Sequence, residues 1–212
     1  MGNFKVDAFE PNLKNTLRFC ESLALNGWKD EQQGNLLAGS SSSVTIWPAG
    51  VSDTPGKLQF FEDPGNPGGG RFGGTYMNRA DPQELPVTTL DKFATDRNWF
   101  ETRPNIAILK VDVERHEANV LVGAAKLLKA RIVKNVFTEL SLEDPKHREM
   151  NVAALQLLVE AGYTLAGQGG WPGPGNASPW AHDENLVKNI FAYLEKEVKE
   201  QKKSYLNLWW TM

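Results

Sequence analysis

Apolar positions along this chain fall into two patterns, short continuous runs and runs spaced by three or four residues. Continuous apolar runs indicate buried strands, and the wider spacing indicates amphipathic helices. Strands are predicted over residues 4–9, 44–47, 57–61, 106–111, 133–137 and 163–166, and helices over residues 11–26, 89–93, 118–130 and 152–161. Strands that alternate with helices in this way predict an α/β fold, with a mostly parallel sheet and helices on both faces.

Helix faces and turn-forming residues add detail to this prediction. The first helix is expected to face the core through Leu13, Leu17, Cys20 and Ala24. Turn residues at 52–56 predict a hairpin between the strands on either side. Glycine and proline concentrate in residues 63–75 and 167–180, which are expected to be loops. Residues 185–194 are compatible with a strand or with the start of a helix.

Length and composition favour a single globular domain over residues 1–212. The net charge of −3 gives no reason to expect nucleic acid or a membrane as a partner, because phosphate binding draws on clustered Lys and Arg. The single cysteine, Cys20, is expected to be a small core residue. No apolar run approaches the ~20 residues of a membrane span, and the first residues do not resemble a signal peptide. A cytoplasmic protein is therefore expected, with no prediction of its oligomeric state.

Two acidic residues directly follow predicted strands, Glu10 after the first strand and Asp112 after the strand at 106–111. Open α/β sheets bind ligands at the carboxyl ends of their strands. The Glu10 carboxylate could accept hydrogen bonds from the two hydroxyls of a ribose. It could equally stabilise the start of the following helix, where a negative charge contributes about 0.3–1 kcal/mol. Both interpretations of Glu10 stay open.

Four titratable residues lie within six positions after the strand at 106–111: Asp112, Glu114, His116 and Glu117. Bringing these groups together near a sheet edge is costly unless a ligand uses them. The start of a helix would account for Glu114 and Glu117, but it does not account for Asp112 at the strand end. The cluster therefore predicts a functional site, with Asp112, Glu114 and His116 as the catalytic candidates.

The segment LKVDVERHEANVLVGAAKLLK, residues 109–129, resembles the hallmark of the FkbM methyltransferase family. In that hallmark a lysine, an apolar residue and Asp-Val-Glu-Gly-His-Glu precede a helix containing Leu-x-Gly-Ala. Four more pieces resemble family elements in the same order: VDAFEPN (6–12), AGVSDTPGKLQFF (49–61), VTTLDKF (87–93) and VFTEL (136–140). Each short piece is weak by itself, and the ordered set over residues 6–162 carries the resemblance.

The resemblance implies a Rossmann-like class I methyltransferase fold and methyl transfer from S-adenosylmethionine to a hydroxyl of a sugar or small metabolite. Glu10 would hold the ribose of this cofactor, and Asp112 would lie beside the methyl donor or the acceptor hydroxyl. Glu114, His116 and Glu139 would border the same cavity, with Glu139 among the residues that contact the acceptor. Asp112 or His116 would take the proton of the hydroxyl. No metal ligand set is predicted.

The loop at 167–180 is the candidate substrate lid. Trp171 in this loop is expected to contact the acceptor, because a tryptophan can stack on a sugar ring. Trp171 and Trp180 can equally be hydrophobic residues that anchor the loop.

Two departures from the family pattern affect these expectations. Arg115 stands where the family has glycine, and its side chain could obstruct close backbone approach or add a cation for an acidic acceptor. The chain also starts at what resembles the second strand, without the first strand and its glycine-rich turn, so weak cofactor binding is expected. Two other classes stay open: an inactive relic of the fold that acts as a binding module, and a dehydrogenase. A dehydrogenase needs a glycine fingerprint after its first strand, and this chain has none there.

Overall fold

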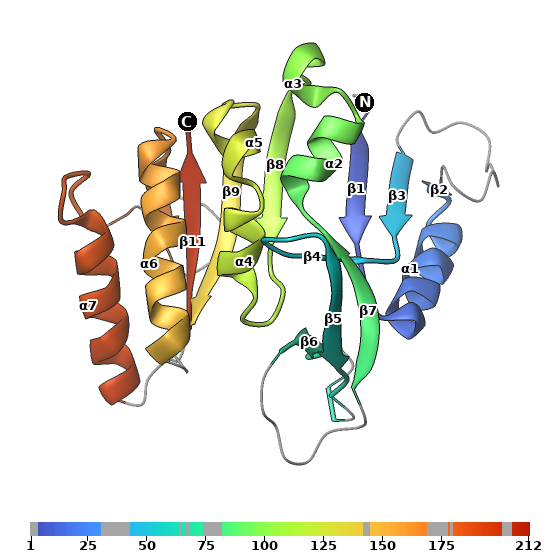
Figure 1. The fold of residues 1–212 in the computed structure, drawn as a ribbon, viewed down its shortest axis with the longest axis horizontal. Coiled ribbons are helices and arrows are strands. Elements are labelled where there is room, and N and C mark those ends of the chain that lie inside the picture. The colour runs from blue at the N-terminus through green and yellow to red at the C-terminus, as the bar shows by residue number, and fades with distance from the viewer. Residues whose placement is uncertain are drawn as a thin grey trace. The chain divides into compact units, whose positions relative to one another are not determined.

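The computed structural model in Figure 1 describes residues 4–30, 43–63, 65–66, 68–73, 82–141, 145–168, 178, 180–200 and 205–212. Strands and helices are interspersed along these residues, which confirms the predicted α/β class. Contacts divide the chain into two compact units, residues 1–51 with 55–88 and residues 52–54 with 89–212. The expectation of a single domain stays a prediction. Among the described residues, no helix is long and apolar enough to cross a membrane.

The first unit contains a parallel sheet in the order β1-β3-β2. Its elements are β1 (Lys5–Phe9), α1 (Leu13–Leu25), β2 (Lys29–Asp30) and β3 (Ser43–Trp47). Val44 and Ile46 of β3 pack with Leu23 of α1 in a small buried core. The strands predicted at residues 4–9 and 44–47 and the first helix are therefore confirmed.

The predicted inward face of α1 is wrong in part. Leu13 and Leu17 are each 63% exposed, and Ala24 is exposed as well, whereas Leu23 is buried. Instead, Leu23 packs with Val44 and Ile46 of β3, and Cys20 is partly buried against the same cluster. The Thr16 hydroxyl lies 3.1 Å from the backbone oxygens of both Glu10 and Asn12 at the start of the helix.

The second sheet of this unit has the order β4-β7-β5-β6. Its strands are β4 (Gly50–Val51), β5 (Gly56–Phe61), β6 (Arg71–Phe72) and β7 (Gln83–Thr88). β5 pairs antiparallel with β6 and β7, and β4 pairs parallel with β7. The predicted hairpin between residues 44–47 and 57–61 is therefore wrong, because β3 joins β1 while β5 finds both partners later in the chain. Phe72, expected in a loop, pairs with Phe60, and their rings lie 5.2 Å apart.

The second unit is built on a sheet in the order β10-β11-β9-β8. Its strands are β8 (Ile106–Val111), β9 (Val133–Ser141), β10 (Thr164–Gln168) and β11 (Tyr205–Thr211). β8 and β9 are parallel, whereas β11 runs antiparallel to β9 and β10. The sheets of the described residues are thus short, and two of the three are mixed rather than parallel. The Rossmann-like class I assignment stays a prediction.

Helices cover one face of this sheet, and Figure 1 shows α4, α5 and α6 in front of the strands with α7 beside α6. They are α4 (Glu117–Val122), α5 (Ala125–Lys129), α6 (Pro145–Glu160) and α7 (Leu186–Lys199). The single helix predicted at 118–130 is two helices, with the break at Gly123. Residues 185–194 form a helix, which settles the alternative that the sequence left open.

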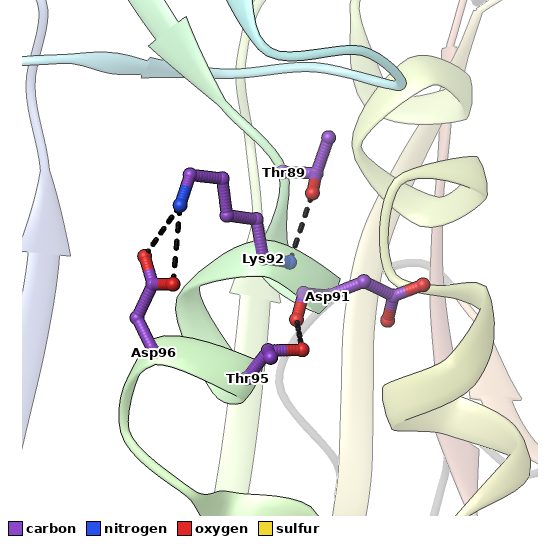
Figure 2. A network of polar contacts seen from close by, with 5 residues as sticks. All are labelled: Thr89, Asp91, Lys92, Thr95 and Asp96. Atoms are coloured by element: carbon purple, nitrogen blue, oxygen red, sulfur yellow. Dashed lines mark hydrogen bonds and ion pairs between the residues drawn. The ribbon is translucent and has the colours of Figure 1, made fainter.

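Two short helices, α2 (Leu90–Asp96) and α3 (Trp99–Thr102), precede β8. Figure 2 shows the contacts that stabilise α2. The Thr89 hydroxyl accepts a hydrogen bond from the Lys92 backbone N–H at 3.0 Å, as an N-cap residue does. The Thr95 hydroxyl donates to the Asp91 backbone oxygen at 2.8 Å, and Lys92 forms an ion pair with Asp96 at 2.8 Å. Thr89 is therefore the N-cap of the helix predicted at 89–93.

Candidate active site

Asp112 follows β8 directly, at the carboxyl end of the strand. Its Oδ2 accepts a hydrogen bond from Lys110 Nζ at 2.6 Å, and the two side chains are 50% and 66% exposed. Residues two apart on a strand point to the same face, which explains the pairing. An exposed pair of this kind contributes at most about 1 kcal/mol. The Asp112 carboxylate is thus accessible at the strand end, beside a cation.

Glu117 holds the loop between β8 and α4. Its side chain is buried, and its Oε1 accepts the backbone N–H groups of Val113 at 3.0 Å and Arg115 at 3.1 Å. Glu114 and Arg115 have φ angles of 54° and 77°, in the left-handed region. A residue with a Cβ is strained there by roughly 1–2 kcal/mol, whereas glycine is not. The glycine of the FkbM-like hallmark therefore suits the backbone at position 115, and Arg115 adopts that backbone at a cost.

Burial raises the pKa of Glu117 above its usual value, and the negative charge of Asp112 raises it further. The two backbone hydrogen bonds from the loop oppose this shift, because they stabilise the ionised carboxylate. Glu117 thus serves as an internal acceptor for the loop.

His116 lies half-buried at the start of α4 and contacts a turn far away in the sequence. Its Nε2 lies 2.9 Å from the hydroxyl of Ser52, which follows β4. The next residue, Asp53, accepts hydrogen bonds from Ser52 at 2.9 Å and from Asn119 at 3.3 Å. Burial acts to raise the pKa of Asp53, but these hydrogen bonds and His116 lower it below its usual value. The Ser-Asp turn and the Asp-Val-Glu-Arg-His-Glu loop are thereby joined in one polar network.

Glu139 lies on β9 beside the end of β8, since Val111 pairs with Thr138 in the parallel register. On the other side it pairs with Asn207 of β11. A pocket of about 270 Å³ opens among these strands. Its apolar lining includes Ile108, Phe137 and Leu208, and its polar lining includes Asp112, Glu139 and Asn207.

The pKa of Glu139 is raised to about 7, and burial is the largest cause. The negative charges of Glu117, Asp112 and Glu114 contribute to this rise, whereas the cation of Arg115 opposes it. These carboxylates therefore lie close enough to act on one another. The predicted cluster and Glu139 are brought together at one end of this sheet, where the local potential is negative.

Glu10 belongs to the first unit, where it follows β1. Its Oε1 accepts the backbone N–H of Asn12 at 2.8 Å. Burial raises the pKa of Glu10, although hydrogen bonds from Asn12 and Asn15 lower it. The contact with Asn12 fits a residue that organises the start of α1, and the ribose contact stays a prediction.

The structure tests only one of the two tryptophans predicted in the loop at 167–180. Trp171 lies outside the described residues, so its predicted contact with the acceptor stays a prediction. The Trp180 ring meets the ring of Tyr193 on α7 at 5.5 Å, a contact that anchors this end of the loop.

Among the residues that the structure describes, no three His, Cys, Asp or Glu side chains are grouped to hold a metal ion.

Sequence reasoning missed the pocket residue Asn207 and the contact of Ser52 with His116. Residues 205–211 alternate in burial, with Leu206, Leu208 and Trp210 buried between more exposed neighbours. This period of two is the signal of a strand with one buried face, and it could have placed Asn207 on the opposite face. No local signal exists for a contact between residues 52 and 116, because it depends on how the turn packs against α4.

Comparison with family models matches residues 1–165 to the methyltransferase FkbM domain. Neither the curated proteins nor the solved structures give a match. The matched region covers most of the chain and includes β1, the Ser52 turn, the loop after β8 and β9. The chain therefore belongs to the FkbM methyltransferase family.

Proposed function

We propose that this chain is an S-adenosylmethionine-dependent methyltransferase that acts on a hydroxyl of a sugar or small metabolite. The observation that carries the proposal is the pocket where Asp112 and Glu139 meet, at the end of β8 and along β9. Family membership supplies the reaction class, and the pocket supplies a place for it.

The charges of this pocket suit a cationic methyl donor. The carboxylates of Asp112, Glu114 and Glu117 raise the pKa of Glu139, which is the effect of a negative potential on a nearby acid. The sulfonium of S-adenosylmethionine is a cation and would be stabilised by the same potential.

In the first unit, the half-buried carboxylate of Glu10 suits the ribose hydroxyls. Residues 4–26 contain no glycine, so the segment around Glu10 has no glycine turn for the methionine part.

The pocket also suits part of a hydroxylated acceptor. At about 270 Å³ it is slightly smaller than the roughly 300–1,000 Å³ of typical ligand pockets. Asp112, Glu139 and Asn207 would bind hydroxyls beside its apolar wall, which includes Ile108 and Phe137. When bound, the cofactor supplies an electrophilic methyl group, and its transfer to a hydroxyl leaves one proton for the protein to remove. Asp112 and His116 are the candidate bases.

The proposal includes a Rossmann-like class I methyltransferase fold. Within the described residues, β1 and β8 are each an edge strand of their own sheet. A class I sheet would give each of these edges a neighbouring strand, which would satisfy its unpaired backbone groups.

Calorimetry with S-adenosylmethionine and S-adenosylhomocysteine tests the charge argument, because only the first carries the sulfonium cation. We expect the chain to bind both, with Asp112→Asn and Glu139→Gln weakening S-adenosylmethionine more than S-adenosylhomocysteine. Glu101→Gln, which removes an exposed carboxylate on α3, serves as the control and should change neither affinity. Absence of binding up to millimolar concentrations would overturn the proposal.

Methyl transfer itself is tested with S-adenosylmethionine labelled in its methyl group. The wild-type chain is incubated with a panel of glycans and small hydroxylated metabolites, and label in the acceptor is measured. Asp112→Asn should lower the transfer rate by about a hundredfold or more if the carboxylate orients the reacting groups. Binding without transfer to any acceptor would favour the binding-module alternative.

A further inference from the structure

Glu139 of β9 lines the pocket between the two strands that flank it, β8 and β11. Its side chain is half-buried, and within the described part of the chain no hydrogen bond or ion pair is made to its carboxylate. Asp112, the other carboxylate among the described lining residues, forms an ion pair with Lys110 at 2.6 Å. Of these two carboxylates, Glu139 is therefore the one with both oxygens available to a ligand.

The charged groups around Glu139 come from β8, from the loop that follows it and from the start of α4. They are Lys110, Asp112, Glu114, Arg115 and Glu117, and β11 adds the neutral side chain of Asn207. Burial and the three carboxylates in this set raise the pKa of Glu139 to about 7, against the opposing cation of Arg115. A carboxyl group with a pKa near neutral pH is suited to taking up a proton and releasing it again.

We propose that Glu139 is the catalytic base of the methyl transfer, taking the proton of the acceptor hydroxyl in this pocket. This inference rests on the proposed function. As the acceptor oxygen forms its bond to the methyl carbon, its proton passes to a carboxylate oxygen of Glu139. The electron pair of the breaking carbon–sulfur bond stays on sulfur, which becomes neutral. Glu139 gives the proton to solvent after the product leaves.

The positions of the other acidic and basic candidates support this assignment. His116 is absent from the described residues that line the pocket, and its Nε2 lies 2.9 Å from the hydroxyl of Ser52. Asp112 does line the pocket, but one of its oxygens is paired with Lys110, which suits a group that orients a ligand. Glu139 combines a place in the pocket with carboxylate oxygens that no described residue binds, and a base needs both.

A base in this position must respond to the charge of the methyl donor. The acceptor oxygen contacts the methyl group during transfer, so a base that contacts the same hydroxyl lies close to the sulfonium. A nearby cation favours the ionised carboxylate, which is the form that accepts a proton. S-adenosylhomocysteine lacks the sulfonium. Binding of S-adenosylmethionine, and not of S-adenosylhomocysteine, should therefore release protons from Glu139 at neutral pH.

Calorimetry in buffers of different ionisation enthalpy measures this proton release on the full chain and needs no acceptor. At pH 7 we expect S-adenosylmethionine to release up to about half a proton more than S-adenosylhomocysteine, because a group with a pKa of about 7 is half protonated there. Glu139→Gln should abolish this difference, and Glu101→Gln, which removes an exposed carboxylate on α3, should keep it.

Each outcome of this calorimetry decides one of the two proposals. Equal proton release by the two ligands in the wild type overturns the role of Glu139 as base, and so does a difference that persists in Glu139→Gln. The wild-type comparison stands even if Glu139→Gln fails to fold. Absence of binding by the wild type overturns the proposed function, and the base role with it.

The pH dependence of methyl transfer gives the second readout, with methyl-labelled S-adenosylmethionine and the panel member that the wild type labels most strongly. Glu139→Gln should lower kcat by about 10²–10⁴-fold, and Glu139→Asp, which keeps a carboxylate, should recover part of it. In the wild type, kcat should fall as the pH drops through the pKa of Glu139, because only the ionised form accepts a proton. Glu139→Gln should lose this fall. An unchanged kcat in Glu139→Gln overturns the base role alone, whereas absence of transfer by the wild type overturns the proposed function.

Discussion

Asp91 Oδ1 accepts the backbone N–H of Leu127 at 2.8 Å, across 36 positions of the chain. Its Oδ2 accepts the N–H of Lys126 at 2.9 Å. These donors lie in the first turn of α5, and Ala124, the residue before this helix, has no side chain that could cap it. Asp91 on α2 therefore caps α5 from another helix. This contact gives a structural role to the aspartate of VTTLDKF (87–93), one of the segments that resemble the FkbM family.

Replacement of this cap should destabilise the second unit. We expect Asp91→Ala to lower the free energy of unfolding by about 1–2 kcal/mol, as loss of an N-cap side chain does. Asp96→Ala removes only an exposed ion pair with Lys92, so it should change the free energy of unfolding by no more than about 0.5 kcal/mol. Urea unfolding followed by circular dichroism measures both. Equal effects of the two substitutions would contradict the capping role.

Close packing at Gly123 predicts that its substitution is severe. A Cβ at this position would overlap the backbone carbonyl oxygen of Ser52, which cannot move as a flexible side chain can. We expect Gly123→Ala to cost about 2–3 kcal/mol, the upper part of the 1–3 kcal/mol range of ordinary overpacking, because backbone rather than a flexible side chain blocks the new methyl group. Thermal unfolding measures this cost. Gly65→Ala, where a Cβ meets only Asp63 Oδ1 at 3.5 Å, should be nearly neutral in the same assay. Wild-type stability of Gly123→Ala would show that the turn is free to move.

The left-handed backbone at position 115 predicts that glycine is preferred there. With a φ of 77°, Arg115→Gly should be more stable than Arg115→Ala by about 1 kcal/mol, because alanine keeps the strain. The two variants lose the same charge, so their difference isolates the backbone. Chemical denaturation of both variants measures it. A more stable alanine variant would mean that the loop does not adopt this φ in solution.

The raised pKa of Glu139 predicts that the stability of the folded protein depends on pH. Its pKa is raised from 4.5 to about 7 in the folded protein. Between these pH values the folded state binds more protons than the unfolded state, so this residue lowers stability as the pH rises. The advantage of Glu139→Gln over wild type should therefore grow by about 1–2 kcal/mol from pH 4.5 to pH 7, after allowance for the partial exposure of the carboxyl group.

Unfolding free energies measured at several pH values check this prediction. Asn207→Ala alters the neighbouring position without a titratable group, so its effect should be similar at every pH. A constant difference between Glu139→Gln and wild type would mean that Glu139 is not perturbed in solution.

Local patterns in the sequence were enough to predict most elements of the second unit. The apolar run at 106–111 is β8, and the apolar positions after residue 152 lie in α6. The same patterns placed Asp112 at a strand end and Glu117 at a helix start. The break at Gly123 was missed, because it comes from a backbone approach that periodicity does not record.

The sequence by itself determined the α/β class, the FkbM family and the acidic cluster after β8, because these depend on residue order and on interactions between near neighbours. Only the tertiary structure decided which strands pair, which face of α1 is buried and which residues surround the pocket. It also brought Glu139 among the carboxylates that raise its pKa, and Ser52 to His116. These relationships join residues far apart in the chain, and they are fixed by the packing of whole elements rather than by any local pattern.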